Sequence, residues 1–76
     1  MKKLLITGAL GQLGHALFDL LKNRQEYRLY LTDSQGSEDG LVSKLDISDE
    51  EAVDHVIQNI RPDTIINCAA MTAVDL

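Results

Sequence analysis

The order of apolar and polar residues divides the first part of the chain into short elements. Lys3–Thr7 is an apolar run without polar alternation, which is typical of a strand buried on both faces of a parallel sheet. Tyr27–Thr32 is rich in strand-forming residues and predicts a second strand. Between the two, apolar residues recur at helical spacing after a glycine-rich turn and predict an amphipathic helix. The members of this apolar stripe are Leu13, Ala16, Leu17, Leu20 and Leu21.

The middle of the chain contains a loop and the start of a second helix. Ser34–Gly40 consists of turn-forming residues, and Leu41–Leu45 predicts a weak third strand. Ser48 and Glu51 have the Ser-x-x-Glu spacing of a capping box, so we expect the helix to be capped by Ser48. One apolar face then follows at Val53, Val56, Ile57 and Ile60.

The helix is expected to end at a proline, and a fourth strand follows it. Pro62 disfavours helical geometry at Arg61, the residue before it. Thr64–Cys68 is apolar enough to form a central strand. The resulting order β-α-β-β-α-β predicts an α/β fold with a Rossmann-type parallel sheet joined by right-handed crossovers. We expect strand order 3-2-1-4, the N-terminal half of a doubly wound fold, with the Ser34–Gly40 loop in place of a crossover helix.

Composition and charge narrow the class of protein. The 76 residues include 7 Lys and Arg against 12 Asp and Glu, a net charge of −5, and 45% of the residues are hydrophobic. These values argue against disorder and against nucleic-acid binding, which needs a basic surface. The single cysteine excludes an internal disulfide. The apolar start is broken by glycines and no run reaches the length of a membrane span, so a soluble, cytoplasmic protein without a membrane partner is expected.

The glycine-rich turn carries the first candidate chemistry. Gly8, Gly11 and Gly14 have the spacing G-x-x-G-x-x-G between a predicted strand and a predicted helix. Gly8 would allow the sharp turn, Gly11 would let a pyrophosphate approach the backbone, and Gly14 would let the helix pack tightly on the strand. N–H groups near Gly11, Gln12 and Leu13 would then point at the phosphates, helped by the helix dipole.

Asp33 is the candidate ribose ligand. It follows the second predicted strand, nineteen positions after Gly14, close to the interval of about 20 residues expected for this role. Its carboxylate would accept from the ribose hydroxyls and repel a 2′-phosphate. The glycine turn and the residues directly after Asp33 contain no Lys or Arg, so NAD(H) is favoured as cofactor, with NADP(H) possible.

Four segments together resemble one family, the dTDP-4-dehydrorhamnose reductases of the extended short-chain dehydrogenase/reductase superfamily. The segments are Thr7–Gly14, Leu45-Asp46-Ile47, Arg61-Pro62-Asp63 and Asn67–Asp75. The resemblance covers essentially the whole chain and places it at the amino-terminal quarter of such a reductase. The glycine motif marks only the superfamily, whereas Asn-Cys-Ala-Ala-x-Thr-Ala-Val-Asp is much more specific.

The resemblance implies further cofactor-binding residues and a function. Asp46 and Ile47 would border the adenine, Ala69 and Ala70 would pass under the cofactor ribose, and Thr72 would face the nicotinamide and substrate. Members of the family reduce the 4-keto group of a nucleotide-linked deoxysugar in dTDP-L-rhamnose biosynthesis, which supplies cell-surface polysaccharide. The partners implied are therefore a nicotinamide cofactor and, in a full-length protein, a dTDP-sugar.

The chain departs from the family in lacking its catalytic pair. In this superfamily the chemistry is carried by Tyr-x-x-x-Lys, but Leu31 follows Tyr27 at that spacing and Ser34 follows Tyr30. We assign no catalytic residue and expect residues 1–76 to be the N-terminal part of an NAD(P)-binding domain, inactive alone, without catalytic and substrate-binding parts. Two alternatives stay open: another extended epimerase or dehydratase, and a non-catalytic nucleotide-binding regulatory subunit.

The cysteine and the two histidines are not assigned to a functional site. Cys68 is expected to be a buried small hydrophobe. His15 and His55 lack partners at metal-ligand spacing, so no metal site is assigned.

The fourth strand is expected to have an open outer edge, which predicts self-association through Thr64–Cys68.

Overall fold

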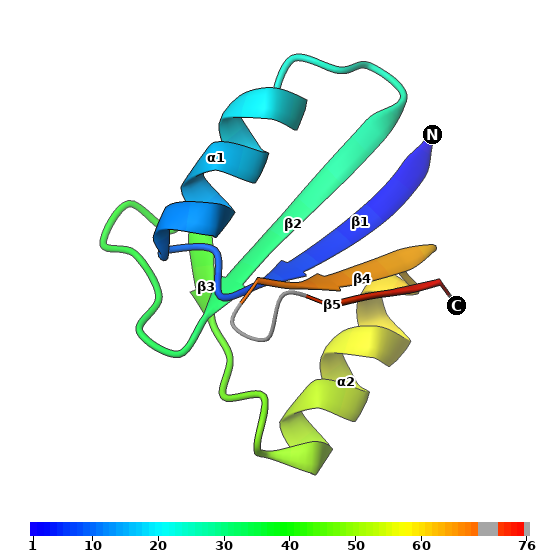
Figure 1. Ribbon diagram of the computed structural model, residues 1–76. Helices are drawn as coiled ribbons and strands as arrows, with labels where there is room; N and C mark the ends of the chain where they lie inside the picture. The colour runs from blue at the N-terminus through cyan, green and yellow to red at the C-terminus, as the bar shows by residue number, and fades with distance from the viewer. Residues whose placement is uncertain (69–71, 76) are drawn as a thin grey trace.

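The computed structural model describes residues 1–68 and the strand at 72–75 (Figure 1). The elements in chain order are β1 (Lys2–Thr7), α1 (Gln12–Leu21), β2 (Tyr27–Asp33), β3 (Val42–Lys44), α2 (Glu50–Ile60), β4 (Thr64–Asn67) and β5 (Thr72–Asp75). The four predicted strands and both predicted helices are therefore present, each within a few residues of its expected bounds.

The sheet has the order β3-β2-β1-β4-β5. β1 pairs in parallel with both β2 and β4, and β2 pairs in parallel with β3. The predicted order 3-2-1-4 and the α/β class are thus confirmed. Because these four strands are parallel, their carboxyl ends lie at one edge of the sheet, where the chain turns from β1 into α1 (Figure 1).

β5 is an element that the sequence interpretation did not contain. It pairs antiparallel with β4, with Thr64 opposite Asp75 and Asn67 opposite Thr72. The expectation that the outer edge of β4 is open was therefore wrong, because the chain reverses and supplies the missing hydrogen-bonding partner itself. The prediction of self-association through Thr64–Cys68 loses its physical basis with it.

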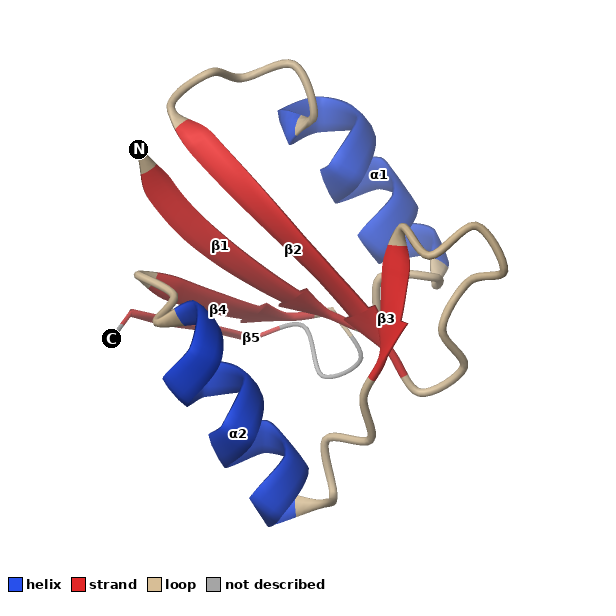
Figure 2. Cartoon of the chain, turned by 180° about the vertical axis from the view of Figure 1, so that it is seen from behind, coloured by secondary structure: helices blue, strands red, loops and turns tan. Residues whose placement is uncertain are grey.

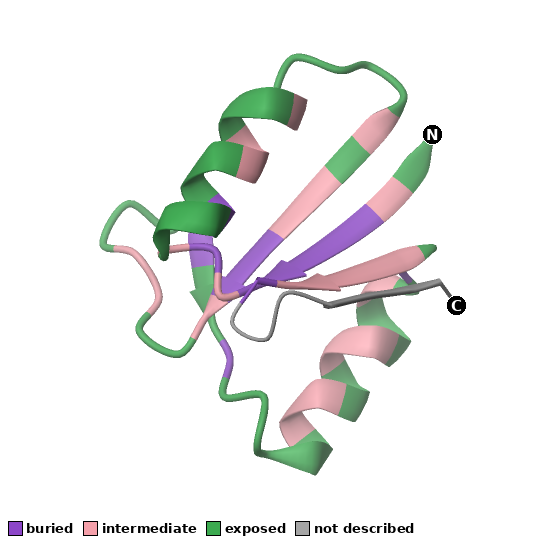
Figure 3. Cartoon of the chain, in the orientation of Figure 1, coloured by how far each residue is buried: buried purple, intermediate pink, exposed green. Residues whose placement is uncertain are grey.

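The two helices cover opposite faces of the sheet (Figures 1 and 2). One buried cluster is formed by Ile6, Ala9, Leu31, Val42 and Cys68, with Leu10, Leu17 and Phe18 packed against it, and Leu4, Leu5 and Leu45 are also buried. The buried parts of β1 and β2 lie towards the carboxyl ends of the strands (Figure 3). The core thus directly supports the edge at which the glycine turn and Asp33 lie, and the expected burial of Cys68 is confirmed.

The buried face of α1 differs from the predicted stripe. Leu13 and Leu20 are exposed, at 42% and 69%, while Gly14 is buried and Phe18 packs against the core. The inward face is formed by Gly14, Leu17, Phe18 and Leu21. Leu17 and Leu21 of the predicted stripe are therefore on the inward face, whereas Leu13, Ala16 and Leu20 are not. The helix is rotated so that its smallest residue faces the turn and its aromatic residue faces the sheet.

The start of α2 also differs from its prediction. Asp49, not Ser48, is the N-cap residue, and its side chain accepts from the N–H of Ala52 at 3.2 Å. Ser48 instead donates its hydroxyl to Asp46 Oδ1 at 2.7 Å. The capping box was therefore wrong by one residue, because an upstream carboxylate captures the serine.

The end of α2 and the β2–β3 connection agree with expectation. Arg61, directly before Pro62, leaves helical geometry with φ 53°, and its N–H still donates to the carbonyl of Ile57. Residues 34–41 connect β2 to β3 without a helix (Figure 2). The connection is closed by Ser37, whose N–H donates to the carbonyl of Val42 at 2.8 Å.

Candidate functional site

The glycine turn joins the end of β1 to α1 and is tied to the neighbouring strand. Gly8 has φ 70°, a left-handed conformation that residues with a Cβ rarely adopt, so its predicted role in the sharp turn is supported. The N–H of Ala9 donates to the carbonyl of Thr32 at 3.0 Å, and the N–H of Gly11 donates to that of Gly8 at 3.2 Å. The turn is therefore held against the carboxyl end of β2.

The first turn of α1 leaves backbone donors open. Gly11 is the N-cap residue and offers no side-chain acceptor, and the first turn contains no acidic residue. In the described part of the chain, the N–H groups of Gln12, Leu13 and Gly14 have no acceptor. Of the expected donors, Gly11 N–H is thus occupied by the protein, while those of Gln12 and Leu13 are open and that of Gly14 joins them.

Gly11 and Gly14 differ in whether the fold has room for a side chain at their positions. A Cβ at Gly14 would lie 2.5 Å from the carbonyl oxygen of Ala9 and 2.6 Å from its Cα, so only glycine fits this close approach. A Cβ at Gly11 would meet nothing nearer than the carbonyl oxygen of Gly8 at 3.6 Å, which is an ordinary contact. The packing of the chain requires glycine at position 14 but leaves room for a side chain at position 11.

Asp33 ends β2 and lies half-buried beside this turn. Its Oδ2 accepts from the N–H of Leu10 at 3.1 Å. Its Oδ1 accepts from the N–H of Gln35 at 3.2 Å and from the hydroxyl of Ser34 at 3.4 Å. The predicted ribose ligand is therefore at the expected edge, with one oxygen committed to the glycine turn.

A cleft at this edge brings together four of the predicted residues. It is lined by Gly8, Asp33, Ser34, Leu45, Asp46 and Ile47. Ser34 and Leu45 were not predicted, although each is the direct neighbour of a predicted acidic residue and could have been found from that position. The N–H of Leu45 donates to the carbonyl of Asp33 at 2.8 Å, so the ends of β2 and β3 are joined at the floor of this region.

Asp46 carries a carboxylate that the chain itself stabilises. Its Oδ1 accepts from both the N–H and the hydroxyl of Ser48, at 2.9 and 2.7 Å. These hydrogen bonds, with that of the hydroxyl the larger effect, hold the pKa of Asp46 below its usual value. Asp46 therefore presents a negative charge at the mouth of the cleft at neutral pH.

The remaining predicted residues follow β4. Ala69 and Ala70 lie outside the described residues. Thr72 is the first residue of β5 and pairs with Asn67, so its backbone is at the same edge of the sheet as the glycine turn. At this edge the hydroxyl of Thr7 donates to Asn67 Oδ1 at 3.0 Å, and burial raises the pKa of the Cys68 thiol, which makes it a poor nucleophile.

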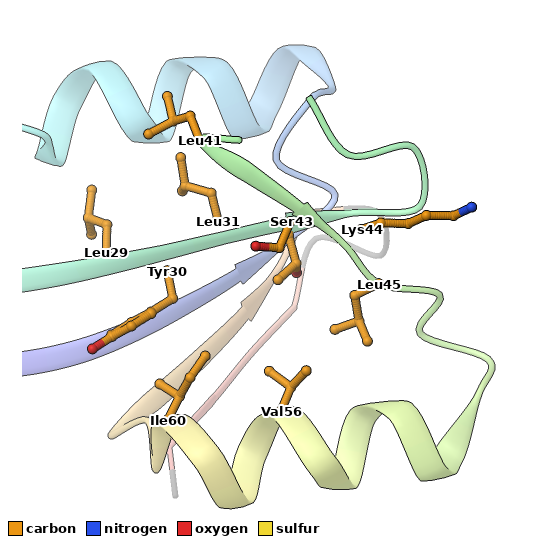
Figure 4. A pocket seen from close by; sticks show the side chains of 10 residues that line it. Leu29, Tyr30, Leu31, Leu41, Ser43, Lys44, Leu45, Val56 and Ile60 are labelled. Atoms are coloured by element: carbon orange, nitrogen blue, oxygen red, sulfur yellow. The ribbon is translucent and has the colours of Figure 1, made fainter. Parts of the chain in front are cut away.

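A second hollow lies along β2 beside the short strand β3 and has different chemistry, since its lining includes side chains on the α1 side of the sheet as well as residues of α2 (Figure 4). Most of its lining is apolar and comes from β2, the β3 region and α2, including Leu29, Leu31, Val56 and Ile60. Tyr30, which is not followed by a lysine four residues later, also lines this hollow (Figure 4). Its apolar walls do not suit phosphate groups, so the cleft beside Asp33 is the better candidate for a nucleotide.

The described residues contain no candidate metal site and no candidate membrane-spanning helix. Among the described residues, no group of three or more His, Cys, Asp or Glu side chains is placed to hold a metal ion. In the same part of the chain, neither helix is long and apolar enough to cross a membrane.

The parallel sheet, the glycine turn and the uncapped helix beside an acidic strand end define a Rossmann-type α/β domain. The chain belongs to the family described as RmlD substrate binding domain, whose model matches residues 1–76. The resemblance to the dTDP-4-dehydrorhamnose reductases is thereby confirmed.

Individual relatives agree with this assignment. The chain is similar to a dTDP-4-dehydrorhamnose reductase of Aggregatibacter actinomycetemcomitans, with 41% identity over 75 residues, which cover 99% of this chain and 23% of the relative. It is 36% identical over 80 residues to an uncharacterized epimerase/dehydratase of Staphylococcus saprophyticus, with 93% of this chain and 24% of the relative covered.

A solved structure shows the same fold. The crystal structure of a hypothetical dTDP-4-dehydrorhamnose reductase from Sulfolobus tokodaii matches with a TM-score of 0.67 and 44% identity, covering 95% of this chain and 25% of that one. The chain thus spans about a quarter of the length of the relatives it matches.

Proposed function

We propose that this chain forms the NAD(P)H-binding part of a reductase that acts on the 4-keto group of a dTDP-linked deoxysugar, in dTDP-L-rhamnose biosynthesis. The family and the named reductases support the reaction class. The observation that carries the proposal is the row of open N–H groups at the start of α1, next to the cleft that contains Asp33. A nucleotide has the two groups that such a site recognises, an anionic pyrophosphate and a ribose diol.

The residues present fit such a cofactor. The N–H groups of Gln12, Leu13 and Gly14 would bind the pyrophosphate, and the missing Cβ of Gly11 would leave space for it. Asp33 would accept from the adenosine ribose, and Asp46 and Ile47 would border the adenine. Ala69, Ala70 and Thr72 would continue the site towards the nicotinamide, which supplies a hydride when bound.

We infer that NADH is preferred to NADPH. Asp33 and Asp46 both line the cleft, and none of the described residues that line it is a Lys or Arg. A 2′-phosphate placed there would meet two carboxylates and no positive charge, which disfavours its binding.

The test is a calorimetric titration of the chain with NADH and NADPH. NADH should bind, NADPH should bind more weakly, and Gly11→Ala should abolish binding while the circular dichroism spectrum stays unchanged. Gly11→Ala is a suitable test variant because the added Cβ has room in the folded protein but would occupy the space assigned to the phosphates. Equal binding by the wild type and Gly11→Ala would contradict the proposal, and preference for NADPH would overturn the role of Asp33.

Turnover is expected to require residues that this sequence lacks. It contains no Tyr-x-x-x-Lys, so the chain alone should bind the cofactor without oxidising NADH in the presence of a dTDP-4-keto-6-deoxy sugar. We propose a cytoplasmic setting, where the single cysteine stays reduced, with no nucleic-acid or membrane partner.

A second candidate function is that of a nucleotide-sugar epimerase or dehydratase with the same cofactor site. It is favoured by the similarity to the Staphylococcus saprophyticus epimerase/dehydratase. Incubating a chain that contains this sequence together with the family's Tyr-x-x-x-Lys pair with the dTDP-4-keto sugar distinguishes the two. Net consumption of NADH indicates a reductase, and conversion of the sugar without net consumption indicates an epimerase. A dehydratase, which would form such a keto sugar by loss of water, should leave it unchanged.

A further inference from the structure

Asp33 connects three segments that lie far apart in the sequence. Its carboxylate accepts from the N–H of Leu10 in the glycine turn, 23 residues away along the chain. Its carbonyl accepts from the N–H of Leu45 at the end of β3. Asp33, the proposed ribose ligand, therefore also contacts the turn that would bind the phosphates.

The bond to Leu10 is a second link between the glycine turn and β2, beside that from Ala9 to Thr32. Leu10 lies between two glycines, Gly8 and Gly11, which lose more conformational entropy on ordering than other residues. Leu10 is half-buried and packs against the core, so removal of the carboxylate takes the acceptor from an N–H in a partly buried position. A hydrogen bond to an ionised carboxylate is stronger than a comparable one between neutral groups, so Asp33 adds a charge-assisted anchor to the backbone bond from Ala9 to Thr32.

The two carboxylate oxygens of Asp33 accept hydrogen bonds from different segments. Oδ2 accepts from Leu10, while Oδ1 accepts only longer bonds from the exposed Ser34 and Gln35. The contact from the hydroxyl of Ser34, at 3.4 Å, is the longest of the three and the easiest for a ribose hydroxyl to replace.

We propose that Asp33 is a positioning residue for the phosphate-binding turn as well as a ribose ligand. Through Oδ2 it fixes Leu10, so that the open N–H groups of Gln12, Leu13 and Gly14 are oriented before a nucleotide arrives. Oδ1 is the oxygen that meets the ribose. This proposal rests on the proposed function, and it predicts that loss of Asp33 weakens binding of nucleotides that have no ribose hydroxyl at all.

The binding test uses ADP and 2′,3′-dideoxy-ADP with the wild-type chain, Asp33→Ala and Asp33→Asn. Asp33→Ala should weaken dideoxy-ADP by at least about tenfold, which is the loss expected for one charged hydrogen bond. Removing a negative charge beside phosphates would by itself strengthen binding, so a loss is diagnostic. Asp33→Asn, which keeps an acceptor for Leu10, should bind dideoxy-ADP within about threefold of the wild type. Unchanged or tighter dideoxy-ADP binding by Asp33→Ala would overturn the positioning role.

Amide hydrogen exchange tests the same bond without any nucleotide. The Leu10 amide should exchange at least about tenfold faster in Asp33→Ala than in the wild type and in Asp33→Asn. The amides of Ala9 and Leu45, which donate to backbone carbonyls, are internal controls that should keep their protection. If the wild type binds neither nucleotide, the proposed function fails, while the exchange rate of Leu10 still decides the positioning role. Equal Leu10 exchange in all three chains would refute it.

Discussion

Two helices begin at the same edge of the sheet, and their first turns are built in opposite ways. α2 begins after Asp49, which accepts from Ala52, and Glu50 and Glu51 lie in its first turn. α1 begins after Gly11, without a side-chain cap and without an acidic residue in its first turn. The positive end of α2 is therefore satisfied by the chain itself, whereas that of α1 is left open.

The difference shows which helix start is available to a ligand. A glycine N-cap is about 0.3 kcal/mol less favourable than a good side-chain cap, and adjacent carboxylates would repel an anion. The side-chain cap stabilises the start of α2. The start of α1, which lies next to the cleft that contains Asp33, has no such cap. The open start is thus the place where an external anion can supply the missing acceptor.

Gly14→Ala should have the largest effect on the α1 side of the comparison. Its Cβ would overlap the backbone of Ala9, so we expect the free energy of unfolding to fall by about 3 kcal/mol. A domain of this size rarely has more than about 3–5 kcal/mol of stability, so the variant should be largely unfolded. Urea denaturation measures this, with Gly11→Ala as the matched control that should change stability by less than about 1 kcal/mol. Similar losses in both variants would mean that position 14 has no special packing requirement.

Asp49→Ala should remove the cap from α2. We expect a loss of about 1 kcal/mol in the free energy of unfolding, because the N–H of Ala52 loses its acceptor. Ser48→Ala is the control, since Ser48 does not cap the helix and its loss should cost less than about 0.5 kcal/mol. A greater loss in Ser48→Ala would restore the capping box as the start of this helix.

Gly11→Ser should convert the start of α1 into one like that of α2. Gly11 has φ −75° and ψ 173°, an extended conformation that serine adopts without strain. A serine hydroxyl there would accept from an open N–H and raise the free energy of unfolding by about 0.3 kcal/mol, while NADH binding should be lost. Thermal denaturation and calorimetry test the two halves of this prediction. Retained NADH binding in a stabilised variant would show that the open donors are not the nucleotide site.

The smallest effect concerns the titration of Asp46. Its pKa is lowered in the folded chain by Ser48, so this carboxylate contributes stability above its unfolded pKa of about 4, and the contribution is lost as the pH falls through the folded pKa. Ser48→Ala removes the hydroxyl but keeps the backbone donor, so it should raise the pKa part of the way back. A carboxyl-detected NMR titration measures both values, and an unchanged pKa in Ser48→Ala would contradict the assigned cause.

The sequence by itself determined the order of the elements and the location of the site. Apolar runs and helical spacing are local signals, and right-handed crossovers leave few ways to arrange four alternating parallel strands. That is why the order 3-2-1-4 and the position of Gly8 and Asp33 at one edge could be predicted, whereas Asp46 and Ile47 were expected there only from the family resemblance.

The tertiary structure decided what depends on contacts between distant residues. α1 turns Gly14 and Phe18 inward together with Leu17, in an orientation that matches the close approach of Gly14 to the backbone of Ala9 and the core beneath. The bond from Leu10 to Asp33 and the antiparallel pairing of β5 with β4 join segments whose separate patterns do not reveal each other. Such features are absent from local periodicity, because their free energy arises only when the two partners have been brought together by the fold.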